Sequence, residues 1–331
     1  MPAEGLIAHT LVSRFADHMP YYRQEAINAR SGIHTPRATL AGWGGRAGAG
    51  LMPLYEAQQA FVLSAGVLQA DETPVDLLDP GAGKTKKAYI WAYSPSPLEG
   101  KSAVVYDFCA GRGGKYPVDF LKGWSGTLVT DGFAGYGVVL KLETRVGANC
   151  MAHARRKFDE LIRVNQSPVA AQAVQRIAWL YRLEREAKDL SAEERLLLRR
   201  NRAKPLYEEL HLWLALERRK VPDGSAIAGA IDYSLNRWAE LTAYLSDAAV
   251  PIDNNHIENL MRPWAMGRKA WLFCGSELAG ERAAVVMSLV QSAKMNGHDP
   301  WAYLKDVLTR LPGHQNSRIA ELLPHNWRPA D

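Results

Sequence analysis

Three carboxylates stand where rigid elements are expected to begin or end. Asp71 follows the apolar run Val67–Ala70, and Asp131 follows the run Thr127–Thr130. Each run is too short for a helix and predicts a buried strand that ends at its carboxylate. Glu258 is expected near the start of a later helix. Two Asp and one Glu on stiff elements can bind two Mg²⁺ ions about 3.5–4 Å apart and drive an in-line displacement at phosphorus.

A structural role is the alternative for each carboxylate taken alone. Asp71 and Asp131 would then be surface turn residues, and Glu258 a charge at a helix start. The segments around them favour catalysis. They are ADETPVDLLDPGAGKTKKAYIWAY, GTLVTDGFAGY, CMAHARRKFDEL and PIDNNHIENLMRPWAMGRKAWLFCGSELAGERAAVVMSLVQSAKMNGHDPWAYL.

These segments resemble DDE transposases of the insertion-sequence sixty-six family, and the similarity runs from about Leu6 to the tail. The resemblance implies an α/β, RNase H-like core in which Asp71, Asp131 and Glu258 are catalytic and hold the metal. Family members usually begin earlier, with a helical oligomerisation region and a Cys-rich zinc-binding segment, so we expect an N-terminally truncated copy. Met151 stands where the family pattern has an aromatic residue.

Composition places the chain among ordinary globular proteins. Its 331 residues are 47% hydrophobic and 23% charged, with a net charge of +5, which weakly favours an anionic partner. Cys109, Cys150 and Cys274 lack the spacing of a zinc ribbon or a disulfide framework. The N-terminus has neither a basic nor an apolar leader region, and no stretch is apolar enough to cross a bilayer. A cytoplasmic location without membrane contact is therefore expected.

Residues 1–50 predict a helix-turn-helix-like DNA-binding segment. A helix over 21–29 is broken by Gly32, and Thr35 is expected to cap the next helix with Pro36 at its first position. Arg37 and Thr39 would then point at DNA. A plain helical hairpin packed on the core is the equal alternative.

Short β-like runs begin at residue 67, after a connecting helix over 51–65. The expected strands are 67–70, 88–93, 103–108, 127–131 and 144–148, with a helix over 116–121. Three strands, a helix and a further strand is the order of an RNase H-like sheet. Residues 51–152 are therefore predicted to form the first part of the core.

A nucleotide-binding loop is not expected, although Gly81–Thr85 ends like one. The motif requires a Gly five positions before Gly83, but Leu78 stands there. The residues after Thr85 predict a strand, whereas the motif is followed by a helix. A hairpin turn is the better interpretation, and no nucleotide hydrolysis is predicted.

Asp131 and Glu258 are 127 residues apart, too far for a simple loop in a compact domain. The pattern between them is helical, with a capping box from Ser191 and Glu194. It predicts a helical insertion over 153–250, with the core resuming over 251–311 and a tail over 312–331.

Basic residues cluster near the predicted site and in the insertion. Near the site, predicted DNA contacts are Arg155, Arg156, Lys157, Arg262, Arg268 and Lys269. The insertion holds Arg195, Arg199, Arg200, Arg202 and Lys204. For these residues a solvated helix face is slightly preferred to contacts with DNA phosphates. His153 is a candidate metal ligand or phosphate contact, although a lone histidine is more often structural.

Asp253 and Glu258 compete as the third carboxylate. Five residues on a helix put them on different faces, and Asp253 is expected to cap the helix that contains Glu258. Glu258 is therefore preferred as the ligand.

The predicted function is a DDE transposase that uses Mg²⁺, or Mn²⁺ in its place, on double-stranded DNA at element ends and target. It would work as a homo-oligomer. Two alternatives stay open: a nuclease of the same fold that cleaves without joining, and an inactive truncated copy that occupies element ends.

Overall fold

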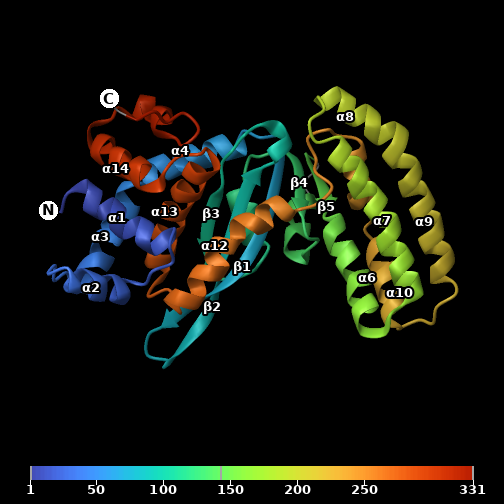
Figure 1. Ribbon diagram of the computed structural model, residues 1–331, viewed down its shortest axis with the longest axis horizontal. Helices are drawn as coiled ribbons and strands as arrows, with labels where there is room; N and C mark the ends of the chain where they lie inside the picture. The colour runs from blue at the N-terminus through green and yellow to red at the C-terminus, as the bar shows by residue number, and fades with distance from the viewer. Residues whose placement is uncertain (1, 142–143, 330–331) are drawn as a thin grey trace. The chain divides into compact units, whose positions relative to one another are not determined.

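The computed structural model describes residues 2–141 and 144–329 and divides into two compact units (Figure 1). Unit 1 comprises Met1–Pro95, Gly100–Trp124 and Ile257–Asp331, and unit 2 comprises Ser96–Glu99 and Ser125–His256. Residues 1, 330 and 331, which end two of the predicted regions, lie outside the described part. Both units combine helices with strands, so the predicted α/β class is confirmed.

Unit 1 contains three strands and most of the helices of the two ends of the chain. Its strands are β1 (Val67–Asp79), β2 (Lys84–Pro95) and β3 (Val105–Cys109). Its helices are α1 (Glu4–Phe15), α2 (Tyr21–Arg30), α3 (Arg37–Gly50), α4 (Met52–Leu63), α5 (Lys115–Phe120), α13 (Glu277–Met295) and α14 (Pro300–Arg310), together with α12 (Asn255–Trp271) from Ile257 onward.

The strands of unit 1 are antiparallel, and β1 and β2 form a long hairpin visible in Figure 1. Asp79 pairs with Lys84 at its tip, where Gly81 and Gly83 adopt positive φ angles of 85° and 64°. Such angles suit glycine, which has no Cβ to collide with the backbone. The predicted hairpin turn in place of a phosphate-binding loop is confirmed.

β1 is much longer than the predicted strand over 67–70, and that prediction was wrong about where the strand ends. The apolar run stops at Ala70, but the pairing with β2 continues to Asp79. Backbone hydrogen bonds hold a hairpin ribbon without an unbroken apolar sequence. Polar residues in 71–74 therefore did not end the strand.

The core of unit 1 lies on one face of this sheet. Ile90, Ala92 and Tyr106 from the strands pack with Ile257 and Trp264 of α12 and with the almost wholly buried middle of α13. The opposite face is covered in part by α5, whose Phe120 stacks on Tyr93 with ring centroids 3.9 Å apart.

Side chains of α13 bond to the backbone of β3, at the edge of the three-stranded sheet, and of the residues that lead into it. Ser288 Oγ accepts a hydrogen bond from Tyr106 N at 2.8 Å, and Ser292 Oγ accepts one from Val104 N at 2.9 Å. Four residues of helix rise about 6.0 Å and two residues of strand about 6.6 Å, so the two repeats match. The edge of the sheet is thereby covered.

Unit 2 contains a parallel pair of strands followed by helices. The strands are β4 (Gly126–Thr130) and β5 (Arg145–Asn149). The helices are α6 (Met151–Asn165), α7 (Pro168–Glu186), α8 (Ala192–Leu198), α9 (Lys204–Arg218), α10 (Ala226–Leu235) and α11 (Trp238–Thr242). Figure 1 shows α6, α7, α9 and α10 side by side, and contacts link α7 to α6 and α9, and α10 to both α6 and α9.

Helix starts test the capping predictions directly. Both bonds of the Ser191–Glu194 capping box are present. Asp299 caps α14 by accepting a hydrogen bond from Ala302 N. The prediction for α3 was wrong by one residue, because α3 begins at Arg37 and Pro36, not Thr35, holds the capping position.

Within the described residues, no helix is both long and apolar enough to cross a membrane.

Candidate functional site

Asp71 lies within β1, at its fifth residue, and not at a strand end as predicted. It pairs with Ala92 of β2, which in turn pairs with Tyr106 of β3. Alternate residues of a strand share a face, so Asp71 is on the side of Val75, which belongs to the core cluster. The carboxylate is partly buried and stands on the core-facing side of the unit 1 sheet.

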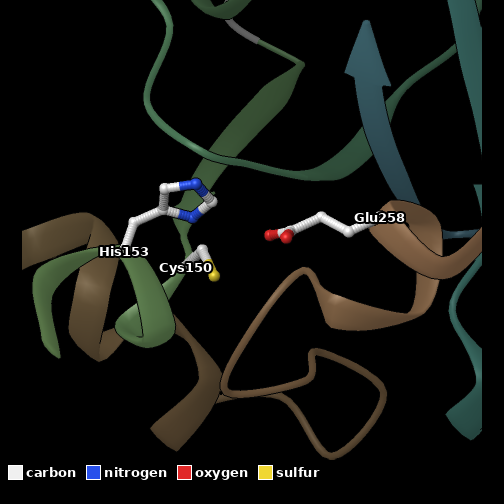
Figure 2. A group of neighbouring side chains, drawn as sticks. All are labelled: Cys150, His153 and Glu258. Carbon is white, nitrogen blue, oxygen red and sulfur yellow. The ribbon is translucent and has the colours of Figure 1, made fainter. Parts of the chain in front are cut away.

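Glu258 lies in the first turn of α12, as predicted, and its side chain is drawn in Figure 2. Ile257 beside it is fully buried in the core, and Met261 three residues later also packs there. Residues three apart share a helix face, so Glu258 lies on the side of α12 that carries Met261.

Two hydrogen-bonded contacts hold α12 over the face that carries Asp71. Tyr106 of β3 donates its hydroxyl hydrogen to the carbonyl of Leu260 at 2.5 Å. Arg268 donates to Thr73 Oγ1 at 2.9 Å and to the carbonyl of Pro74 at 2.7 Å. Unit 1 therefore places two of the three predicted ligands, Asp71 and Glu258, on one side of its sheet.

The Asp253 carboxylate binds the first residue of α12, but Asp253 does not hold the capping position predicted for it. Its Oδ1 accepts a hydrogen bond from Asn255 N at 3.1 Å, and its Oδ2 accepts one from Asn255 Nδ2 at 2.8 Å. The helix starts at Asn255, so Asp253 lies two residues before it and not at the adjacent position.

Asp131 follows the last residue of β4, as predicted. Its Oδ1 accepts a hydrogen bond from Phe133 N at 2.8 Å across Gly132, whose φ is +85°. The Tyr233 hydroxyl donates to the Asp131 carbonyl at 3.0 Å. The Arg237 guanidinium lies 4.2 Å from the centroid of the Tyr233 ring. Burial raises the pKa of Tyr233, Asp131 raises it further, and Arg237 opposes both.

Neither Tyr233 nor Arg237 was predicted as part of the site. Both lie on or after α10, and Tyr233 is 102 residues from Asp131 in the sequence. No local pattern signals a contact over that distance. In the structure they bring a cation and a hydroxyl beside the residues that follow β4.

Cys150 and His153 stand at the junction of β5 and α6, and Figure 2 shows the two side chains beside each other. The Cys150 sulfur and a ring nitrogen of His153 lie within 4.8 Å. Cys150 Sγ also accepts a hydrogen bond from Asn254 N at 3.2 Å. Residues three apart meet at a helix start. The spacing of Cys150 and His153 in the sequence could therefore have signalled this pair.

The residues predicted to contact DNA differ in their exposure and in whether they bind other residues of the protein. Arg155, Arg156 and Lys157 are all exposed along α6, and Arg262 and Lys269 are exposed on α12. Arg155 lies 3.6 Å from Asp159, and Lys157 lies 5.7 Å from the Tyr233 ring centroid. Arg268 is bonded to β1, as described above. Arg37 and Thr39 are exposed in the first turn of α3.

The second basic cluster is not a wholly solvated helix face. Arg199 is fully buried, bonded to both carboxylate oxygens of Glu184 and to the carbonyls of Tyr244, Asp247 and Val250. Arg195 is also buried and donates to the carbonyls of Leu190 and Ala248. Arg200, Arg202 and Lys204 are exposed. The solvated-face prediction was wrong for the two buried arginines, because their partners come from distant segments.

Comparison with known proteins identifies the family. One family model, described as transposase IS66 family, matches residues 1–282, and a second, described as IS66 C-terminal element, matches residues 288–325. The chain belongs to the IS66 transposase family. The resemblance found in the four sequence segments is thus confirmed.

Curated relatives of this IS66 family member come from Sinorhizobium fredii (strain NBRC 101917 / NGR234). The uncharacterized proteins y4jD, y4hP and y4qI are 36%, 35% and 38% identical to it. The matches cover 99%, 98% and 99% of this chain but 66%, 62% and 63% of the relatives. The chain therefore spans just under two thirds of their length.

Proposed function

We propose that this chain acts as a DNA transposase, which cleaves DNA at the ends of an insertion sequence and joins the freed 3′-hydroxyl to target DNA. The observation that carries the proposal is the position of Glu258, on a helix fixed over the face of β1 that bears Asp71, in a chain of a transposase family. The succession β1, β2, β3, α5, β4 is the predicted RNase H-like order and supports that core.

Asp71, Asp131 and Glu258 are the proposed ligands of Mg²⁺, for which Mn²⁺ would substitute. All three offer carboxylate oxygens, the hard donors that these ions prefer, so the donor set fits. Asp71 and Glu258 are partly buried on a strand and a helix, which limits their movement. Bound metal would stabilise the charge that develops on the phosphate oxygens during displacement.

The basic residues would hold the DNA backbone. Arg155, Arg156 and Lys157 are exposed cations in the second turn of α6, and Arg262 and Lys269 are exposed cations on α12. Such contacts position a duplex without reading its sequence. Double-stranded DNA is the proposed partner, and a homo-oligomer in the cytoplasm is the proposed working form.

Two matched substitutions test the assignment. Glu258→Gln should abolish cleavage and joining of labelled element ends while DNA binding and the melting temperature stay near wild type, because only a charge is removed. Asp253→Asn should retain activity and lose about 1 kcal/mol of stability or less, since Asn also caps helices. An inactive Asp253→Asn beside an active Glu258→Gln would contradict the third ligand.

The same assay separates the alternatives. Cleavage without joining by the wild type would indicate a nuclease. Binding without either reaction, in Mg²⁺ and in Mn²⁺, would indicate an inactive copy that occupies element ends.

A further inference from the structure

A cavity of about 130 Å³ lies within unit 1, between α1, α3, β1, the end of α12 and the start of α13. Its walls are largely aromatic, from Phe15, Tyr21, Trp264 and Trp271. A cavity of about 150 Å³ holds one benzene ring, so this volume suits a single six-membered ring. None of the proposed metal ligands lines it.

Positive charge in the cavity exceeds negative charge. Arg14, Arg268 and Arg282 line it, while its lining carboxylate, Asp76, is 2.6 Å from Lys87 Nζ. The Arg14 guanidinium lies over aromatic rings, 4.3 Å from the Tyr21 centroid and 5.0 Å from the Trp271 centroid. Burial lowers the pKa of Arg14. A partly buried cation stacked on rings, with no carboxylate bonded to it among the described residues, favours an anionic or electron-rich ligand.

Two indole donors of the lining have no acceptor. Trp264 is 1% exposed, and its Nε1, like that of Trp271, is buried without a hydrogen-bond partner in the described part of the chain. A buried N–H without an acceptor is unfavourable, so an acceptor supplied by a ligand would stabilise the complex. The cavity thus offers donors and rings, and its complement is a flat ring edged with acceptor oxygens.

Glycines keep the cavity open. A Cβ at Gly267 would collide with the Trp271 ring, and a Cβ at Gly44 would collide with the Tyr21 hydroxyl. The outer edge of the Trp271 ring and the Tyr21 hydroxyl therefore lie directly against helix backbone.

The cavity also lies along β1 from a proposed metal ligand. Val75, which lines it, shares a strand face with Asp71 four residues earlier. Four residues of extended strand span about 13 Å. A DNA strand with a phosphate at Asp71 would bring a base a few nucleotides away to the cavity.

We propose that this cavity receives one unpaired pyrimidine base, with thymine favoured, from the DNA strand on which the chain acts. The two carbonyl oxygens of the base would accept from the indole donors, and its ring would stack on the Arg14 guanidinium, which lies over the Trp271 and Tyr21 rings. This inference rests on the proposed function, since it takes DNA as the ligand.

The test compares two short duplexes that differ only in one unpaired thymine near the 3′ end, with binding measured by fluorescence anisotropy in EDTA. The wild-type chain should bind the duplex with the unpaired thymine about tenfold more tightly, the usual size of one stacking contact. Gly267→Ala, which pushes Trp271 into the cavity, and Arg14→Met should each lose that preference and keep the affinity for the paired duplex. Gly229→Ala, which meets open space on α10, is the matched control and should keep both.

Competition distinguishes the possible ligands. Thymidine monophosphate should abolish the preference, while inorganic phosphate at the same concentration should not. An equal preference in wild type, Gly267→Ala and Arg14→Met, or displacement by phosphate alone, would overturn the proposal. Because the assay needs no cleavage, active protein that lacks the preference refutes only the cavity, whereas failure to bind either duplex refutes the DNA function.

Discussion

Asp107 of β3 is a carboxylate whose surroundings favour its protonated form. Burial, followed by the charges of Glu281 and Asp119, raises its pKa to about 6, against a thiol hydrogen bond from Cys109 at 3.2 Å that lowers it. The folded chain therefore holds a proton that the unfolded chain releases near pH 4. Stability from this group is full below about pH 4 and is lost as pH rises through about 6.

Asp107→Asn should remove this pH dependence. The wild type should lose up to about 3 kcal/mol of unfolding free energy between pH 4 and pH 6.5, the equivalent of a shift of about two pKa units. The variant should be nearly flat over the same range and more stable than the wild type at pH 7. Urea titrations at several pH values measure this, with the exposed Asp189→Asn as control. Parallel curves for wild type and Asp107→Asn would refute it.

Residues near one another in sequence were the predictable part of the site. Asp131 after a strand, Glu258 in a first helical turn and the engaged carboxylate of Asp253 all depend on local patterns. Tyr233 beside Asp131 and the bond from Arg268 to Thr73 depend on tertiary packing, which periodicity does not encode. The combination of the three carboxylates as one site stays a prediction.

At the scale of elements, the turn that follows α8 depends on one buried side chain. Arg199 begins a π-helical turn, Arg199–Ala203, and its guanidinium binds Glu184 of α7 together with three carbonyls in the segment 244–250. The arginine side chain has five N–H donors in a planar fork, and they match this set of acceptors. A lysine has one nitrogen and cannot bind all of these acceptors at once. One residue thus joins three segments of unit 2.

Arg199→Ala should destabilise the chain by about 3–5 kcal/mol, because it leaves Glu184 and the three carbonyls without their donor. Arg199→Lys should recover only part of that loss. The control is Arg200→Ala on the exposed neighbouring position, which should change stability by less than about 0.5 kcal/mol. Chemical unfolding measures all three. A loss as small for Arg199→Ala as for Arg200→Ala would show that the network contributes little.

Elements with strong local signals were predicted better than their boundaries. The five strands and the helix over 116–121 were all anticipated, and the Ser191–Glu194 capping box fixed the start of α8 correctly. The length of β1 was missed, because hairpin pairing and not side-chain apolarity extends it. α13 begins at Glu277 because Ser276 caps it by accepting a hydrogen bond from Ala279 N.

For the whole molecule, exposed charge in each of the two units bears on DNA binding. Arg37 lies at the exposed start of α3, and Arg155 at the exposed start of α6. If residues 1–50 form a helix-turn-helix, Arg37 reads bases, while Arg155 contacts phosphate whatever the sequence.

Arg37→Ala should therefore weaken binding to element ends by about 1–3 kcal/mol and leave binding to random duplex almost unchanged. Arg155→Ala should weaken both alike and reduce the salt dependence of binding by about one unit of slope. Titrations over a range of salt concentrations measure both effects. Unchanged end binding by Arg37→Ala would mean that the segment is a structural hairpin.

The serines of α13 that cover β3 have a consequence for insertions and deletions. Ser288 and Ser292 bond to residues 182 and 188 positions earlier, and they fit only because the helix and strand repeats stay in phase. One residue inserted between them would turn Ser292 by about 100° and free the Val104 amide to pair with another chain. The same insertion at the β1–β2 tip would disturb no such phase. A one-residue insertion or deletion should therefore be tolerated at the tip of the β1–β2 hairpin, whereas the same change in α13 should make the protein aggregate.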